Sequence, residues 1–140
     1  MDGVISLGVG EPDFVTPWRI REAAIYSLEK GYTMYTSNYG LLELRKEISG
    51  YLKRRYDLSY NPANQVLVTV GVSQALDLSM RAILDPGDEV IIPEPTYVSY
   101  VPCVTLAGGI AVTVPTHMEN SFRVQPADIE ARITPRTKAI

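Results

Sequence analysis

The chain has 140 residues, of which 46% are hydrophobic and 21% charged, and its formal net charge is −3 at pH 7. This length and balance are typical of one soluble globular domain. The net negative charge argues against nucleic-acid binding, and no apolar run approaches the roughly 20 residues that a membrane span needs.

The chain has a single cysteine, Cys103, and a single histidine, His117. One cysteine cannot form an intramolecular disulfide, and the N-terminus lacks the pattern of a signal peptide. We therefore expect a cytoplasmic protein. One histidine and one cysteine exclude a His/Cys zinc site, so no metal is expected. Cys103 lies in an apolar helical stretch, which favours a small core residue over a nucleophile.

A glycine-rich turn and a helix are predicted near the N-terminus. Residues Gly8–Asp13 alternate glycines before a proline, which predicts an exposed turn. This segment lacks the third glycine of a dinucleotide-binding fingerprint. Thr16 is expected to cap the following helix, with Pro17 as its first helical residue and Gly31 at its end.

A tyrosine-rich loop precedes a second predicted helix. The segment Tyr32–Gly40 has no helical period, and its phenol groups suit either ligand contacts or simple cover for a core edge. Leucine and isoleucine at spacings of three and four predict an amphipathic helix over Leu41–Tyr56, with charged residues such as Arg45 facing water. Residues Asp57–Gln65 are expected to form a turn-rich connector.

From Val66 onward, predicted strands and helices alternate three times with short turns between them. This alternation predicts βαβ units in a mostly parallel sheet, and therefore an α/β fold. Ligands of such sheets gather at the carboxyl ends of the strands. The predicted strands are Val66–Val70, Glu89–Ile92 and Ile110–Val114, with another at Lys138–Ile140; the predicted helices are Ser73–Leu84, Val98–Ala107 and Pro126–Ile133.

The turn after the first of these strands is a candidate anion site. The chain turns at Gly71 into a helix expected to open at Ser73, where free backbone N–H groups and the positive helix end suit a phosphate or carboxylate. Tyr97 follows the next strand and is flanked by Pro93 and Pro95. A fixed aromatic ring beside a phosphate site suits a flat, phosphorylated cofactor, although a structural turn and a packed tyrosine are the alternative.

Five segments carry a resemblance that covers nearly the whole chain. They are Ile5–Asp13, Tyr35–Gly40 followed by Leu44 and Arg45, Val70–Leu76, Asp85–Val90 and Pro93–Tyr100. Their residues and order resemble the N-terminal part of a class I/II aminotransferase, a pyridoxal 5′-phosphate (PLP) enzyme of fold type I similar to aspartate aminotransferase.

The resemblance implies a three-layer αβα fold that is incomplete in this chain. Residues 1–40 would form the N-terminal arm, a helix and a loop that contacts the cofactor and the dimer partner, partly within the family's small domain. Residues 41–140 would form the first part of the PLP-binding large domain, with its mostly parallel sheet. The chain is therefore expected to be an N-terminal fragment.

The resemblance also assigns roles to individual residues. The backbone and hydroxyl at Gly71, Val72 and Ser73 would hold the phosphate of PLP, and Tyr97 would stack on its pyridine ring. Tyr35 would reach the PLP phosphate of a partner subunit, which implies a homodimer.

Two further implications concern the substrate and the catalytic base. The backbone at Gly10 would lie by the substrate carboxylate. The Schiff-base lysine of the family is expected beyond Ile140, so no catalytic residue is assigned within the chain and the 140 residues alone are expected to be inactive.

The intact protein is accordingly predicted to move an amino group between an amino acid and a 2-oxo acid, in biosynthetic amino acid metabolism. A PLP-dependent lyase or an aminocyclopropane-carboxylate synthase-like enzyme would share the same cofactor cradle. A non-catalytic ligand sensor, such as the aminotransferase-like half of a transcription regulator, is a further alternative. A plain nucleotide-binding domain is disfavoured because the glycine fingerprint is missing.

Overall fold

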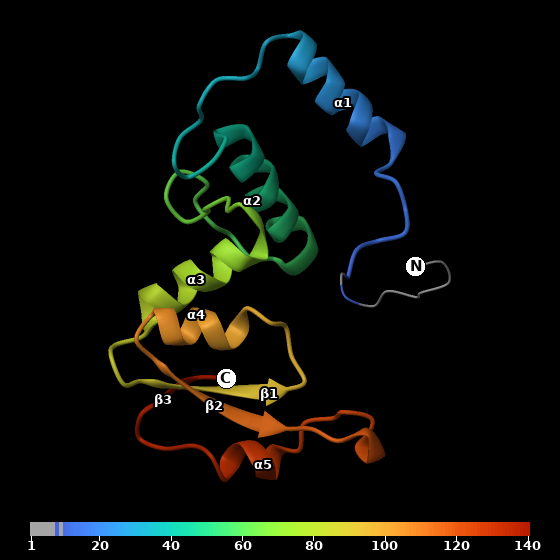
Figure 1. Cartoon of the computed structure of the whole chain (residues 1–140). Helices are drawn as coiled ribbons and strands as arrows, with labels where there is room; N and C mark the ends of the chain where they lie inside the picture. The colour runs from blue at the N-terminus through green and yellow to red at the C-terminus, as the bar shows by residue number, and fades with distance from the viewer. Residues whose placement is uncertain (1–7, 9) are drawn as a thin grey trace. The chain divides into compact units, whose positions relative to one another are not determined.

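The computed structural model describes residue 8 and residues 10–140 (Figure 1). The part of the segment Ile5–Asp13 at Ile5–Leu7 and Val9 lies outside the described residues. The chain forms two compact units, of which the first ends at Asn38 and the second is Tyr39–Ile140. In the described part of Gly8–Asp13 there is neither helix nor strand, in agreement with the predicted turn.

Helix α1 (Trp18–Glu29) lies in the first unit. The prediction that Thr16 caps it is wrong: the N-cap is Pro17, and no side chain caps the helix. Pro17 has an extended ψ of 141°, and its carbonyl accepts the first helical bonds from the N–H groups of Ile20 and Arg21. The predicted end is confirmed, since Gly31 follows the last turn with a φ of +75°.

Helix α2 (Leu42–Tyr56) opens the second unit, and one of its charged residues is buried. Arg45 is only 5% exposed, and its Nη1 donates to the carbonyls of Pro62 at 2.6 Å and Ala63 at 3.1 Å. Its guanidinium also lies 5.7 Å from the ring centroid of Tyr39. The prediction that Arg45 faces water is therefore wrong, because the turn-rich connector folds back over the helix and its carbonyls need donors.

Residues 66–70 do not form the predicted strand. Within the described part of the chain, the N–H of Val68 donates to the carbonyl of Tyr39 at 3.0 Å, and the carbonyl of Thr69 accepts from the N–H of Gly71 at 3.0 Å; neither bond belongs to a strand ladder. An apolar, β-branched run becomes a strand only where a neighbouring strand offers a ladder of such bonds, and none does here. Helix α3 (Gly71–Ile83) then begins two residues earlier than expected.

Within the described residues, strands β1 (Glu89–Glu94), β2 (Ile110–Pro115) and β3 (Thr137–Ala139) form a parallel sheet in the order β2-β1-β3. Helix α4 connects β1 to β2, and a 3-10 turn and α5 connect β2 to β3 (Figure 1). The predicted α/β fold with a parallel sheet is confirmed, with shorter helices than expected. The bounds of the connecting elements are α4 Tyr100–Leu106, η1 Met118–Asn120 and α5 Pro126–Glu130.

Strand β1 is the centre of the core. Its first four residues are all buried, as expected for a strand with a neighbour on each side and packing on both faces. Cys103 is 7% exposed and reduced, which confirms its interpretation as a small core residue. The buried apolar side chains are Leu84, Val90, Ile91, Ile92, Cys103, Val104 and Val114.

The buried carboxylate of Glu89 ties β1 to the turn before β3. Glu89 is 4% exposed and accepts hydrogen bonds from the Thr134 hydroxyl at 2.6 Å and from Arg136 Nη2 at 2.6 Å. The hydrogen bond from Thr134, followed by those from Arg136, lowers the pKa of Glu89 below its ordinary value of 4.5, against the opposing effect of burial.

This lowered pKa predicts how stability depends on pH. A carboxyl whose pKa is lower in the folded state stabilises the fold above its ordinary pKa, and this stabilisation is lost as the pH falls below about 4.5 towards the folded value. We expect Glu89→Gln to lower the melting temperature of the intact protein at pH 7, with a deficit that shrinks below pH 4.5. Glu119→Gln, at an exposed position, is the control. A loss of melting temperature that is equal at every pH would contradict the lowered pKa assigned to Glu89.

The Arg45 contacts predict a second effect on stability. Arg45→Met leaves two turn carbonyls without their donor, and we expect the free energy of unfolding to fall by about 2 kcal/mol. Urea denaturation of the intact protein measures this change. Lys46→Met, at an exposed position of the same helix, should change stability little. Equal effects of the two substitutions would show that Arg45 does not hold the connector.

Candidate functional site

Helix α3 begins in the geometry that an anion site requires. Gly71, its first residue, has a φ of +75°, and a Cβ there would meet no heavy atom within 4 Å. The space beside this turn is therefore open, and any side chain would be disfavoured by the backbone conformation alone. The first N–H groups of a helix have no partner within it. The N–H of Gly71 donates to the carbonyl of Thr69 at 3.0 Å, so the N–H groups that follow, from Val72 on, are the ones that can serve a ligand.

The segment Pro95–Tyr97, after β1, meets this helix end. The Ser73 hydroxyl lies 3.1 Å from the Tyr97 hydroxyl, and the ring of Tyr97 packs edge-on against Tyr100 with centroids 5.7 Å apart. The two loops that were predicted to face one crevice therefore do meet, even though the strand expected before Gly71 is not formed. Tyr97 remains 48% exposed, which leaves its ring accessible.

The protonation of Tyr97 depends on this contact. The hydrogen bond from Ser73, followed by one from Ser99, lowers the pKa of the Tyr97 phenol below its ordinary value of 10.0, and burial opposes the shift weakly. In the phenolate form Tyr97 can only accept, so the Ser73 hydroxyl is then the donor; in the neutral phenol either hydroxyl can donate. A phosphate oxygen at the start of α3 would compete for the same donor.

An open groove of about 680 Å³ runs beside Tyr97 at the carboxyl ends of β1 and β2. Its lining includes Thr116, which follows β2 and which no sequence motif marks as a site residue. Ser99 was missed as well, although it lies within the segment Pro93–Tyr100. The groove is lined by Glu94, Pro95, Thr96, Tyr97, Val98, Val101, Pro115 and Thr116.

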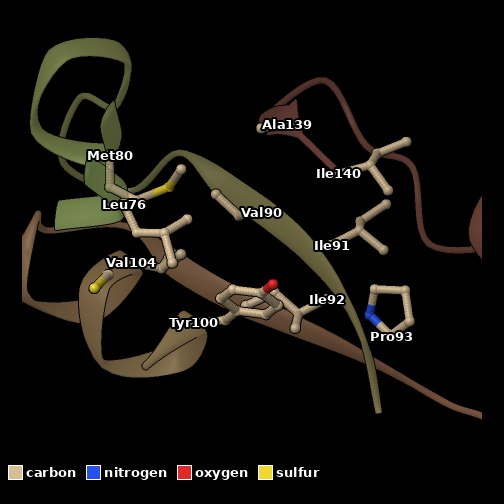
Figure 2. Close-up of a pocket in the computed structure, with 11 residues that line it drawn as sticks. Leu76, Met80, Val90, Ile91, Ile92, Pro93, Tyr100, Val104, Ala139 and Ile140 are labelled. Atoms are coloured by element: carbon tan, nitrogen blue, oxygen red, sulfur yellow. The ribbon is translucent and has the colours of Figure 1, made fainter. Parts of the chain in front are cut away.

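A second cavity, of about 260 Å³, lies behind Tyr100 and is apolar (Figure 2). Its only side-chain polar groups are the Tyr100 hydroxyl and the Cys103 thiol, so it offers neither charge nor a general base. We interpret it as packing space between the helices and the sheet. Its lining is Leu76, Met80, Val90, Ile91, Ile92, Pro93, Tyr100, Cys103, Val104, Ala139 and Ile140.

Two of the expected site residues, Tyr35 and Gly10, lie in the first unit. The Tyr35 side chain is fully exposed in an irregular segment. Gly10 is also in irregular chain, and a Cβ there would meet no atom within 4 Å. Their roles towards a partner subunit's phosphate and a substrate carboxylate stay predictions.

Three lysines are engaged by neighbours on their own unit. Lys53 pairs with Asp57, Lys138 lies 3.9 Å from an oxygen of Asp88, and Lys30 lies over the ring of Tyr26. Among the described residues there is no cluster of three or more potential metal ligands. In the same part of the chain, every helix is too short or too polar to cross a membrane.

A helix N-terminus that can bind an anion, placed beside an exposed aromatic ring in a parallel α/β fold, defines a class of phosphate-cofactor proteins. The sequence profile described as "Aminotransferase class I and II" matches residues 2–140. The chain belongs to this aminotransferase family.

Named relatives agree with the family. The chain is 62% identical over 140 residues to the Bacillus subtilis protein YugH, which is named as an aminotransferase, and 46% identical over 140 residues to aspartate aminotransferase of Pyrococcus abyssi. Each alignment covers all of this chain and 36% of the relative. The chain therefore spans about a third of the length of these relatives.

A solved structure shows the same fold. The crystal structure of aromatic aminotransferase from Pyrococcus horikoshii superposes with a TM-score of 0.89 at 44% identity, over 98% of this chain and 36% of that one. Aspartate aminotransferase from Thermotoga maritima gives a TM-score of 0.86 at 42% identity, over 96% and 36% of the two chains. The predicted α/β architecture of the family is thereby confirmed.

The Ser73–Tyr97 contact predicts a measurable titration. We expect Ser73→Ala to raise the pKa of Tyr97 towards 10.0, because the phenolate loses its main hydrogen-bond donor. The near-ultraviolet absorbance of phenolate formation, with Tyr97→Phe subtracted to isolate one phenol among nine, measures this value. Ser79→Ala, on the same helix, is the control and should leave the titration unchanged. A Tyr97 pKa indifferent to Ser73 would contradict the contact.

Proposed function

We propose that the protein that carries this chain is a PLP-dependent aminotransferase, which moves an amino group between an amino acid and a 2-oxo acid. The observation behind the proposal is the pairing of Ser73 with Tyr97 at the open start of α3. Family membership and the names of the relatives support the same activity.

The residues of this site fit PLP. The phosphate needs several donors at one point, and the backbone N–H of Val72 together with the Ser73 hydroxyl can supply them, joined by the Gly71 N–H on exchanging the Thr69 carbonyl for a phosphate oxygen. The pyridine ring needs a flat apolar surface, and the half-exposed ring of Tyr97 can supply it. When bound, PLP supplies an electron sink for the charge that develops at the α-carbon of an amino acid.

Each side chain of the cradle has a binding or orienting role in this proposal. The Ser73 hydroxyl turns its proton from the phenol oxygen of Tyr97 to a phosphate oxygen. Tyr97 keeps its edge-on contact with Tyr100, so the plane of its ring stays fixed while a ligand stacks on it. The charge of the phosphate is stabilised by the positive end of the α3 dipole.

The first unit would complete the site in an assembled enzyme. We propose that Tyr35, whose side chain is fully exposed here, contacts the PLP phosphate of the partner subunit in a homodimer. The backbone at Gly10 would lie by the carboxylate of the substrate. We propose that the protein acts in the cytoplasm in amino acid biosynthesis.

The lysine that binds the cofactor covalently is proposed to follow Ile140, as the resemblance to the family implies. We propose that residues 1–40 form the N-terminal arm, helix and contact loop and that residues 41–140 form the first part of the PLP-binding large domain. In this account the 140 residues contain half of a cofactor cradle, and we expect them to be inactive alone.

Binding of PLP and of pyridoxal, which lacks the phosphate, tests the proposal. In the intact protein we expect Ser73→Ala to weaken PLP binding roughly tenfold to a hundredfold, since a hydrogen bond to a charged group is lost. Pyridoxal binding should change much less. Visible absorbance during a cofactor titration measures both constants, and Ser79→Ala is the matched control.

Activity separates the proposed reaction from its alternatives. Conversion of added 2-oxo acids to amino acids by the PLP-loaded protein supports an aminotransferase. Elimination or ring closure without a 2-oxo acid would favour the lyase or synthase, and PLP binding without turnover of any amino acid would favour a sensor. An intact protein that binds no PLP would overturn the whole assignment.

A further inference from the structure

One residue holds the end of β1 by two hydrogen bonds. The backbone N–H and the side-chain Oγ1 of Thr116 both donate to the carbonyl of Glu94, each at 2.7 Å. Glu94 is the last residue of β1, and in the register of the sheet it lies opposite Pro115. Thr116 thus extends the β1–β2 pairing by one residue, with its hydroxyl as an additional donor.

This carbonyl is the last fixed point before the loop that carries Tyr97. The next residue, Pro95, has no N–H, so the loop cannot continue the ladder of β1 by donating from its first residue. Tyr97 follows two residues later. The direction in which this segment leaves the sheet therefore depends on how the Glu94 carbonyl is held, and both of its donors belong to Thr116.

The far end of the loop is held by weaker contacts. The Tyr97 hydroxyl meets Ser73, whose hydroxyl the proposed function assigns to a phosphate, and also Ser99, and its ring meets the edge of Tyr100. The Tyr97 carbonyl accepts from the N–H of Tyr100 at 3.2 Å, a local bond of the turn into α4. When a ligand takes the Ser73 donor, the anchor at Glu94 remains the polar restraint that ties the loop to the sheet. Thr116 also lines the groove beside Tyr97, so it is half-buried next to the ring that it would position.

We propose that Thr116 is a positioning residue that fixes the ring of Tyr97 over the cofactor site by holding the Glu94 carbonyl. The proposal rests on the proposed function, in which Tyr97 is the surface for the pyridine ring. Thr116 lies outside the set of residues proposed to bind PLP; it acts through the backbone of Glu94 and contacts no cofactor itself.

Three substitutions in the intact protein test the proposal. Thr116→Val keeps the shape and the backbone N–H but removes the hydroxyl. Thr116→Ser restores the hydroxyl and should restore the wild-type behaviour. Thr113→Val makes the same change at an exposed position of β2 and controls for the loss of a threonine in this strand.

The first measurement needs no cofactor. If Thr116 holds the loop, Thr116→Val lets Tyr97 drift from Ser73, and the phenol pKa, isolated by subtracting Tyr97→Phe, moves up towards 10.0. Thr116→Ser and Thr113→Val should titrate like the wild type. A general loss of folding would shift the pKa values of all the tyrosines together, whereas loss of positioning shifts the pKa of Tyr97 alone.

The second measurement uses the PLP-loaded protein. We expect Thr116→Val to weaken PLP binding roughly three- to tenfold, as for loss of one hydrogen bond, and to reduce the circular dichroism that the bound cofactor shows in the visible range. This signal reports how the cofactor ring is oriented. Thr116→Ser should recover both values.

The outcomes separate this proposal from the proposed function. An unchanged Tyr97 pKa with unchanged PLP affinity and dichroism in Thr116→Val would overturn the positioning role, even in an active aminotransferase. If the wild type bound no PLP but Thr116→Val still raised the Tyr97 pKa, Thr116 would position Tyr97 as inferred and the cofactor assignment would be the part that fails.

Discussion

The hydrogen bond between the hydroxyls of Ser73 and Tyr97 is the contact on which the candidate site depends. It joins the start of α3 to the loop after β1, two segments separated by 24 residues in the chain. At one place it brings together unpaired helix N–H groups, a hydroxyl donor and an aromatic ring. The same bond lowers the pKa of Tyr97, so one contact accounts for both the geometry and the electrostatics of the site.

Strand β1 makes this contact possible because it is the most constrained element of the fold. Strands β2 and β3 lie on its two sides, and its first residues are buried. Hydrogen bonds from Arg136 to Glu89 and from Thr116 to Glu94 hold its two ends. A strand held in this way presents its following loop in one position. The loop can then supply a rigid aromatic surface at low entropic cost, which is what stacking of a flat cofactor requires.

Local signals predicted the sheet and the meeting of the Gly71 turn with the Tyr97 loop. The apolar run from Glu89 gives β1 within two residues, and Gly71 was predicted as the turn into α3, although the helix begins at this glycine and not at Ser73. The predictions that were wrong concern residues whose structure depends on partners distant in the sequence. Residues 66–70 have strand composition but no neighbouring strand, and Arg45 has a water-facing pattern but meets carbonyls 17 and 18 residues away. Thr116 was missed for the same reason, since its role comes from the register of two strands.

The central claim is that the start of α3 and the Tyr97 loop hold one phosphorylated cofactor. A crystal structure of the intact protein with PLP tests it most directly. The account predicts the phosphate within hydrogen-bonding distance of the Ser73 hydroxyl and of the N–H groups at Gly71 and Val72, with the pyridine ring stacked on Tyr97. A phosphate bound elsewhere, with the Ser73–Tyr97 hydrogen bond still intact, would contradict it.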